Sequence, residues 1–222
     1  MMPRVTEPEL MDDMAQAAAY DAADFSAAHG RRVELFGDRW PGEAPPRHML
    51  DLGCGSGDVL ERFAAAFPDA RFTGVDGAAA MLDLARARMA RAGFASRLRF
   101  VQALMPSDDI PDDGYDVVMS HSLLHHLHEP AVLWETVKRH ARPRSFIFVA
   151  DLRRPESEAA ARALVDDLSA GEPEVLQRDF YNSLRAAFTP DEIRAQLDAA
   201  GLSSLAVETD GDIHVLVHGH IK

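Results

Sequence analysis

The sequence contains a single cysteine, Cys54, among 222 residues. No internal disulfide can form, which fits a reducing compartment. No apolar run approaches the roughly 18 residues that a membrane-spanning helix needs. The N-terminal stretch MMPRVTEPELMDD is acidic and lacks the basic-then-apolar pattern of a signal peptide. We therefore expect a cytoplasmic protein with no membrane partner.

Positive charge is also scarce. Lys and Arg number 23 against 36 Asp and Glu, which gives a formal net charge of −13. A surface of this sign repels phosphate backbones, so no nucleic acid partner is expected. The stretch RARMARAGFASRLR carries five arginines, but their spacing fits a solvated helix face followed by a turn. Hydrophobic residues make up 47% of the chain, enough for a sizeable core.

From residue 48 onward, short apolar runs alternate with helical patterns, which predicts βαβ units and a doubly wound α/β fold. Strands are predicted at 48–52, 71–76, 98–101, 115–120 and 145–151. Helices are predicted at 58–67, 79–92 and 130–141. Asp58 is expected to cap the first of these helices, and Gly93 to end the second.

The rest of the chain departs from this alternation. A single domain is expected over 1–222, with a helical N-terminal cap at 1–36 and a Pro/Gly-rich linker at 37–47. The core spans 48–151, a helical insertion 152–188, and a final helix with a β-hairpin 189–222. Thr189, Pro190 and Glu192 form a capping-box signature, and Asp210-Gly211 predicts the hairpin turn.

The stretch LDLGCGSGDV places Gly53, Gly55 and Gly57 after the first strand. Glycine lets the backbone turn sharply and lets a ligand pack against it. Asp76 ends the next strand, 19 residues past Gly57, where a carboxylate can bind ribose hydroxyls. A dinucleotide loop reads G-x-G-x-x-G, but Asp58 stands at its third glycine and would face a pyrophosphate. A cofactor without phosphates, S-adenosylmethionine, fits better; a tight turn with no ligand is the alternative.

Four features of residues 48–222 are similar to those of one enzyme family: LDLGCGSG, the acid of GVDG, YDVVMSHSLLHHLHEP and the terminal hairpin. With these features the segment resembles the class I S-adenosylmethionine-dependent methyltransferases. The SLLHHLHEP stretch resembles the small-molecule branch, which includes the ubiquinone/menaquinone-type enzymes. The resemblance implies a Rossmann-like seven-stranded sheet in the order 3-2-1-4-5-7-6, with the last strand antiparallel. It also implies S-adenosyl-L-methionine as cofactor and S-adenosyl-L-homocysteine as product.

The resemblance transfers a set of cofactor-binding residues, from the glycine loop to the end of the fourth strand. These are Asp51, Gly53, Cys54, Gly55, Gly57, Asp76, Gly77, Met81, Ala103, Leu104, Ser120 and His121. Asp51 would lie near the cofactor's amino group, and Ser120 and His121 near its methionyl part. Ala103 and Leu104 stand where many relatives carry Gly-Asp, so adenine would be held by backbone and apolar contacts. Cys54 is expected to be a small buried side chain beside the loop.

Candidate catalytic and acceptor-binding residues lie in three segments. The catalytic candidates are His125, His126 and Tyr181, and the substrate-binding candidates are Tyr20, Asp24, His29, Phe180, Asn182 and Arg185. For each, the alternative is structural: a loop hydrogen bond for the histidines and core or lid packing for the others. The spacing of the histidines at 121–128 matches no zinc signature, so no metal is expected. The histidines at 214, 218 and 220 are expected on an exposed or edge face.

We therefore predict an S-adenosylmethionine-dependent methyltransferase acting on a small-molecule acceptor, by in-line displacement at the sulfonium methyl. The leaving group is a neutral thioether, so catalysis consists largely of alignment, and a base is needed only for an acceptor that holds a proton. The alternatives are a protein or tRNA substrate, or a non-catalytic S-adenosylmethionine-binding protein. The acceptor atom stays open, as does the choice between monomer and homodimer.

Overall fold

The computed structural model describes residues 2–10, 20, 25–42 and 44–221. The strands are β1 (His48–Leu52), β2 (Arg71–Asp76), β3 (Leu98–Gln102), β4 (Tyr115–His121), β5 (Ala141–Leu152), β6 (Ala206–Asp210) and β7 (His214–His220). The helices are α2 (Ser26–Arg39), α3 (Asp58–Ala66), α4 (Ala79–Ala92), α5 (Ala131–His140), α6 (Glu158–Leu168), α7 (Glu174–Ala186) and α8 (Pro190–Ala200), with short 3₁₀ helices η1 (Ala95–Arg97) and η2 (Leu124–His126). Among these described residues, no helix is both long and apolar enough to cross a membrane.

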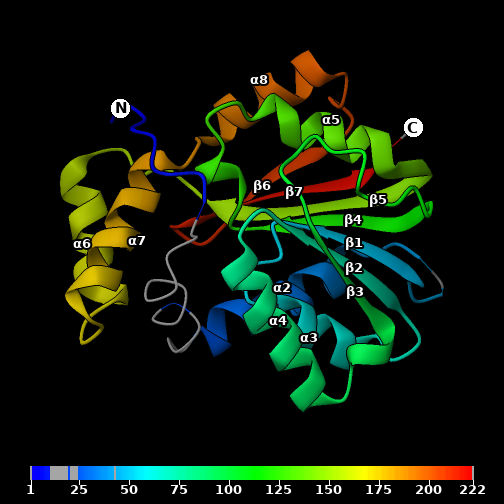
Figure 1. Cartoon of the computed structure of the whole chain (residues 1–222). Coiled ribbons are helices and arrows are strands. Elements are labelled where there is room, and N and C mark those ends of the chain that lie inside the picture. Colours follow the sequence, from blue (N-terminus) through cyan, green and yellow to red (C-terminus); the bar gives the residue numbers. More distant parts are fainter. Residues whose placement is uncertain (1, 11–19, 21–24, 43, 222) are drawn as a thin grey trace.

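The seven strands form one sheet in the order β3-β2-β1-β4-β5-β7-β6. The first five run parallel, and β7 is antiparallel to both β5 and β6. Helices α5 and α8 cover one face, whereas α2, α3 and α4 cover the other (Figure 1). The predicted order and the antiparallel last strand are both confirmed.

Strand β5 shows why the sheet is buried on both faces. Ile147 and Val149 lie in the core beneath α5 and α8, while Phe146 and Phe148 lie in the core beneath α2 and α3. Successive side chains of a strand point to opposite faces, so a strand between two helical layers must be apolar throughout. The continuous run FIFVA therefore fits a central strand.

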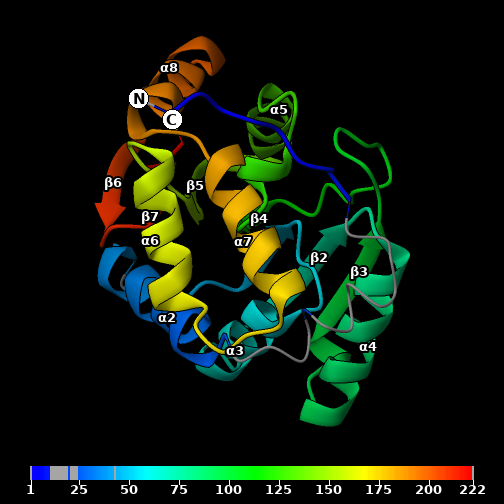
Figure 2. The same ribbon diagram turned by 90° about the vertical axis from the view of Figure 1, so that its left-hand side faces the viewer.

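Helices α6 and α7 lie across one end of the sheet, which faces the viewer in Figure 2. Residues 2–9, here called the N-terminal strap, run beside them without helical structure. The strap is tied to α7 by Val5, whose N–H donates to Arg185 O, and by Arg4, whose Nε donates to Ala186 O. Arg4 Nη2 also donates to two carbonyl oxygens of the η2 segment, those of His125 and Leu127.

Two local predictions are wrong. Residues 2–9 are not helical, and α2 continues to Arg39, inside the expected linker. Asp58 does not cap α3; Gly57 is the N-cap, with a left-handed backbone, and Asp58 is the first helical residue. The hairpin predicted at Asp210-Gly211 is confirmed; Asp210 pairs with His214, so its connection consists of Gly211 to Ile213. The capping box at Thr189 and Glu192 is confirmed.

Candidate functional site

A cavity of about 1000 Å³ lies at the carboxyl ends of β1, β2 and β4. The glycine loop and the residues after β2 form one side, and η2, α2 and α7 form the other. Parallel strands place all their carboxyl-terminal loops at one edge, so residues far apart in the sequence meet there. The lining includes 16 of the sequence-predicted site residues: Tyr20, His29, Asp51, Gly53, Cys54, Gly55, Gly57, Asp76, Gly77, Met81, Ala103, Leu104, His121, His125, His126 and Phe180.

The glycine loop has a backbone that only glycine adopts readily. Gly53 has φ of +75°, and a Cβ built there would meet the Leu123 side chain at 2.8 Å. The N–H groups of Gly53 and Cys54 both donate to Val75 O, at 2.8 and 2.9 Å. These bonds fix the loop to the end of β2 and leave it without side-chain bulk toward the cavity.

Asp76 connects the glycine loop to the start of α4. Its Oδ2 accepts from Gly55 N at 2.8 Å, and its Oδ1 accepts from Ala78 N at 2.9 Å. Burial raises the pKa of this carboxyl, and these backbone N–H groups oppose that shift. Each oxygen retains a second lone pair, so the carboxylate can accept further hydrogen bonds from a ligand.

Asp51 is 1% exposed, and its Oδ1 has no hydrogen-bond partner among the described residues. Burial, followed by the charge of Asp76, raises its pKa well above 3.8. A buried polar atom without a hydrogen-bond partner destabilises the folded protein, so such atoms are rare. Because the side chain lines the cavity, the missing partner fits a group on a bound ligand.

The other sequence-predicted side chains on this side are apolar or unreactive. Cys54 is buried, and burial raises its thiol pKa well above 9.0, which supports a structural role. Met81 is 5% exposed, whereas Leu104 is 64% exposed at the rim. Ala103 N donates to Asp76 O. Cys54, Met81, Ala103 and Leu104 together give this end of the cavity an apolar surface, which suits an aromatic ring of a ligand.

At the end of β4, two adjacent residues that the sequence predicts for the site have different positions. Ser120 is fully buried, and its Oγ donates to Leu52 O at 2.7 Å, so it holds strands β1 and β4 together and does not line the cavity. His121 does line the cavity, and neither ring nitrogen has a hydrogen-bond partner in the described chain. Burial, aided by the charge of Arg32, lowers its pKa well below 6.5, so it is neutral near pH 7.

Arg32 was not predicted from the sequence. It lies on α2, is 3% exposed and lines the cavity. Its Nη1 has no partner among the described residues. Burial lowers the pKa of the guanidinium, but arginine stays charged at neutral pH. A buried guanidinium that faces a cavity and has a nitrogen without a hydrogen-bond partner indicates a binding site for an anionic group.

His125 and Asp151 form a buried pair beside the cavity. His125 Nδ1 lies 2.6 Å from Asp151 Oδ1, and both side chains are almost fully buried. Burial lowers the pKa of His125, but the charge and hydrogen bond of Asp151 outweigh it, so the pKa lies above 6.5. The carboxylate also accepts from Leu124 N and Leu152 N, at 2.7 Å each. Asp151 therefore fixes the orientation of the imidazole ring through its Nδ1 side.

His126 lies against His125, with ring centroids 4.1 Å apart. Burial, followed by the charge of His125, lowers the pKa of His126 to about 3, so it is neutral. Glu7 of the N-terminal strap reaches both rings. Its Oε1 lies 3.5 Å from His125 Nε2 and 3.2 Å from His126 Nδ1. Neither Glu7 nor Asp151 was predicted as a site residue.

On the α2 side, the rings of Tyr20, Phe25 and His29 lie in a row, tilted against one another, with centroids 4.8 and 5.2 Å apart. Burial, followed by the charge of Asp58, raises the pKa of Tyr20 to about 12. His29 Nδ1 lies 2.5 Å from Asp58 Oδ2, which joins α2 to the glycine-loop helix. Asp24, predicted for this group, lies outside the described residues.

Helix α7 presents one face to the cavity through Leu176, Asp179, Phe180 and Ser183. This spacing is that of a single helix face. The other predicted residues of this segment, Tyr181, Asn182 and Arg185, do not line the cavity. The Tyr181 ring instead lies between the guanidinium groups of Arg162 and Arg185, at 4.9 and 5.5 Å from its centroid.

The three C-terminal histidines do not share one environment. His214 is half-buried and lines the cavity, contrary to the exposed face predicted for it. Burial lowers its pKa to about 4. His218 is half-buried near Glu208, and only His220 is exposed. The antiparallel strand β7 thus brings its first residue, not its last, to the cavity edge.

Comparison with known proteins gives a consistent result. A family model described as a methyltransferase domain matches residues 50–147. Trans-aconitate 2-methyltransferase of Methylobacterium radiotolerans is 53% identical over 57 residues, which are 26% of this chain and 22% of that protein. The 27-O-demethylrifamycin SV methyltransferase of Amycolatopsis mediterranei is 28% identical over 191 residues, 83% of this chain and 65% of that protein. The chain thus spans less than two thirds of either relative.

Among solved structures, a SAM-dependent methyltransferase from Aquifex aeolicus superposes with a TM-score of 0.70. The alignment covers 95% of this chain and 99% of that one, at 18% sequence identity. This likeness shows a shared fold over nearly the whole chain.

Proposed function

The chain belongs to the class I S-adenosylmethionine-dependent methyltransferases, and from this premise we propose that it methylates a small-molecule acceptor. The observation that carries the proposal is the single continuous cavity of about 1000 Å³. It joins the glycine loop and Asp76 to His125, Arg32 and α7, so a cofactor and an acceptor can lie side by side. A cavity of this size suits small ligands.

The residues on the glycine-loop side fit the cofactor. The glycine loop leaves space that a Cβ would fill, Asp76 has free lone pairs for two ribose hydroxyls, and Asp51 has an orphaned oxygen for an ammonium group. Gly77, Met81 and the Ala103-Leu104 segment would flank the adenine. Arg32 would pair with an anionic group, either the carboxylate of the amino-acid tail or one on the acceptor.

When bound, the cofactor supplies a methyl group on a sulfonium whose leaving group is a neutral thioether. The chain's own contribution is to hold the acceptor in line with that methyl group and to exclude water. Alignment of two reactants can supply about 7–11 kcal/mol of the barrier. Phe180, Leu176 and His214 shape the acceptor space, and neutral His121 lies beside it. His125, oriented by Asp151, lies in the cavity wall beside the acceptor space.

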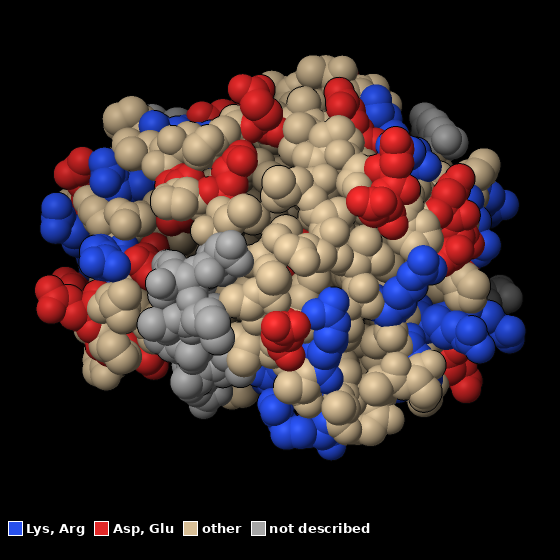
Figure 3. All heavy atoms as spheres, in the orientation of Figure 1, with Lys and Arg blue, Asp and Glu red and all other residues tan. Residues whose placement is uncertain are grey.

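A small acceptor is favoured over tRNA by the charge distribution. On the face in Figure 3, Lys and Arg side chains lie between Asp and Glu side chains rather than in one continuous basic surface. The excess of acidic residues points the same way. The lone cysteine fits a reducing compartment, so we place the reaction in the cytoplasm.

Calorimetric titration with S-adenosylmethionine tests the proposal, with NAD as a second ligand. We expect micromolar affinity for S-adenosylmethionine and none for NAD. Asp76→Ala should weaken binding at least tenfold, because it frees Gly55 N and removes the ribose acceptors. Asp69→Ala, an exposed carboxylate before β2, is the matched control and should bind normally. Binding of NAD alone would refute the proposal. If the cofactor binds, labelled methyl transfer to a fractionated metabolite pool should then identify the acceptor.

A further inference from the structure

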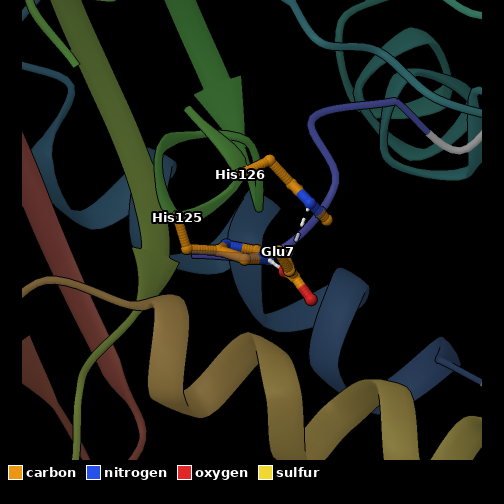
Figure 4. A group of neighbouring side chains, drawn as sticks. All are labelled: Glu7, His125 and His126. Carbon is orange, nitrogen blue, oxygen red and sulfur yellow. Dashed lines mark ion pairs between the residues drawn. The ribbon is translucent and has the colours of Figure 1, made fainter. Parts of the chain in front are cut away.

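Glu7, His125 and His126 converge beside the cavity, two from η2 and one from the N-terminal strap (Figure 4). Their ligand-capable atoms all lie within 4.8 Å of one another. Glu7 Oε1 is 3.2 Å from His126 Nδ1 and 3.5 Å from His125 Nε2. Metal–ligand bonds of about 2.0–2.2 Å at tetrahedral angles separate neighbouring ligand atoms by about 3.3 Å. The carboxylate therefore stands at coordination spacing from both imidazoles.

The surroundings match those of a metal centre as well. Asp151 binds the Nδ1 side of His125, so in the neutral ring that carries its proton on Nδ1 the lone pair on Nε2 faces Glu7. A carboxylate on the far nitrogen is the usual support of a metal-binding histidine. Ser183 Oγ donates to Glu7 Oε1 at 3.0 Å and so orients the third ligand. His126 Nδ1 is buried with no hydrogen-bond partner in the described chain, although Glu7 is near.

We propose that Glu7, His125 and His126 bind a divalent transition-metal ion, for which Zn²⁺ is the best match. Two imidazoles and one carboxylate are the donor set of open zinc sites, which keep a further position for a ligand. His125 and His126 both line the cavity, so that position faces the acceptor space. The inference rests on the proposed function in one respect: the ion would hold an acceptor through a hydroxyl or carboxylate oxygen.

The adjacent histidine pair alone matches no zinc signature, which is why the sequence predicts no metal. The third ligand comes from residue 7, which precedes the whole sheet-forming core in the sequence, whereas both histidines lie within that core. The strap is held in place by Arg4, through its bonds to Ala186 O and to the carbonyls of His125 and Leu127. These bonds fix the Glu7 segment to η2 independently of any ion.

The test is titration of tag-free, chelator-treated protein with Zn²⁺ by calorimetry and with Co²⁺ by visible absorption. We expect one site of micromolar or tighter affinity and an intense d–d band for Co²⁺. Glu7→Gln and His126→Ala should each weaken binding at least about tenfold. Glu9→Gln is the matched control: it removes the same charge from the same strap, and its carboxylate binds His128 N instead.

Absence of stoichiometric binding, or equal affinity in Glu7→Gln, His126→Ala and Glu9→Gln, would overturn the metal site. S-adenosylmethionine titration of the same samples separates the two proposals. Normal cofactor binding without metal binding refutes the metal site and leaves the proposed function standing; it also shows that the variants are folded. Metal binding without cofactor binding refutes the proposed function.

Discussion

The cavity has two walls, and they differ in the number of separate chain segments that contribute residues to them. The glycine-loop wall consists of residues 51–58 and 76–81, from two neighbouring strand ends. The histidine wall consists of Arg32, His121, His125, Phe180 and His214, each from a different element. Backbone groups dominate the first wall, as in the bonds from Gly53, Cys54 and Gly55. Buried charged and aromatic side chains dominate the second. A wall of backbone groups keeps its shape when side chains are substituted, so it suits a ligand that a whole family shares. A wall of side chains can differ between proteins that bind different acceptors.

The largest expected effect is a loss of stability when Asp151, which supports the histidine wall, is replaced. Asp151→Asn removes the charge that His125 and two backbone N–H groups contact, and both partners are buried. Breaking such a pair destabilises by about 3–5 kcal/mol. Urea unfolding measures the loss, with the exposed Asp166→Asn on α6 as control. Equal stability of the two variants would mean that Asp151 does not anchor this wall.

Arg32→Met should separate binding from stability. Loss of a charge-assisted hydrogen bond to an anionic ligand should weaken affinity by about 1.5–3 kcal/mol, roughly ten- to hundredfold. The melting temperature should change little, because relief of the cost of burying the guanidinium offsets the loss of its attraction to Asp151 and Asp210. Calorimetry with S-adenosylmethionine and the KM of the acceptor identify which ligand carries the anion.

Arg31→Met, at a half-exposed neighbour on α2, controls for the loss of an arginine. It should leave both the cofactor affinity and the acceptor KM unchanged. If Arg32→Met also changes neither, the guanidinium has no role in ligand binding.

A smaller effect should distinguish two adjacent residues of α7. Phe180→Leu trims the cavity lining and should raise the acceptor KM severalfold, in line with about 1 kcal/mol of lost contact. Tyr181→Leu changes a ring that lies between Arg162 and Arg185, outside the lining. Its KM should stay near the wild-type value. A larger effect from Tyr181→Leu would restore the catalytic role that the sequence predicted for it.

The smallest effect concerns the link between α2 and the glycine-loop wall. Burial raises the pKa of Asp58, but His29 and Arg62 outweigh it, so the pKa lies below 3.8. A carboxyl group whose pKa is lower in the folded than in the unfolded protein stabilises the fold at pH values above its unfolded pKa. This contribution is lost as the pH falls from the unfolded pKa toward the folded pKa. Asp58→Asn should therefore lose about 1 kcal/mol at pH 7 and progressively less below pH about 4. Urea unfolding across this range measures it; a gap that widens in acid would contradict the assignment.

Much of the fold followed from local pattern. The alternation of apolar runs with helices, the capping box at Thr189 and the resemblance together predicted the strand order. They did not predict that residues 2–9 form an extended strap, because its fixed place comes from Arg4 and Val5 bonding to α7 and η2. A short segment with no periodicity of its own carries no signal for such contacts.

The sequence by itself determined the glycine loop and its companion Asp76, because a tight backbone turn needs glycine and the acid follows at the next strand end. It could not separate Phe180 from Tyr181, since only the rotation of α7 decides which ring faces the cavity. Nor could it connect Glu7 to His125, or Arg32 to His214, because these pairs meet only where the parallel sheet gathers its loops at one edge. Tertiary structure alone decided that half of the site, since burial and long-range proximity are not properties of any short stretch of chain.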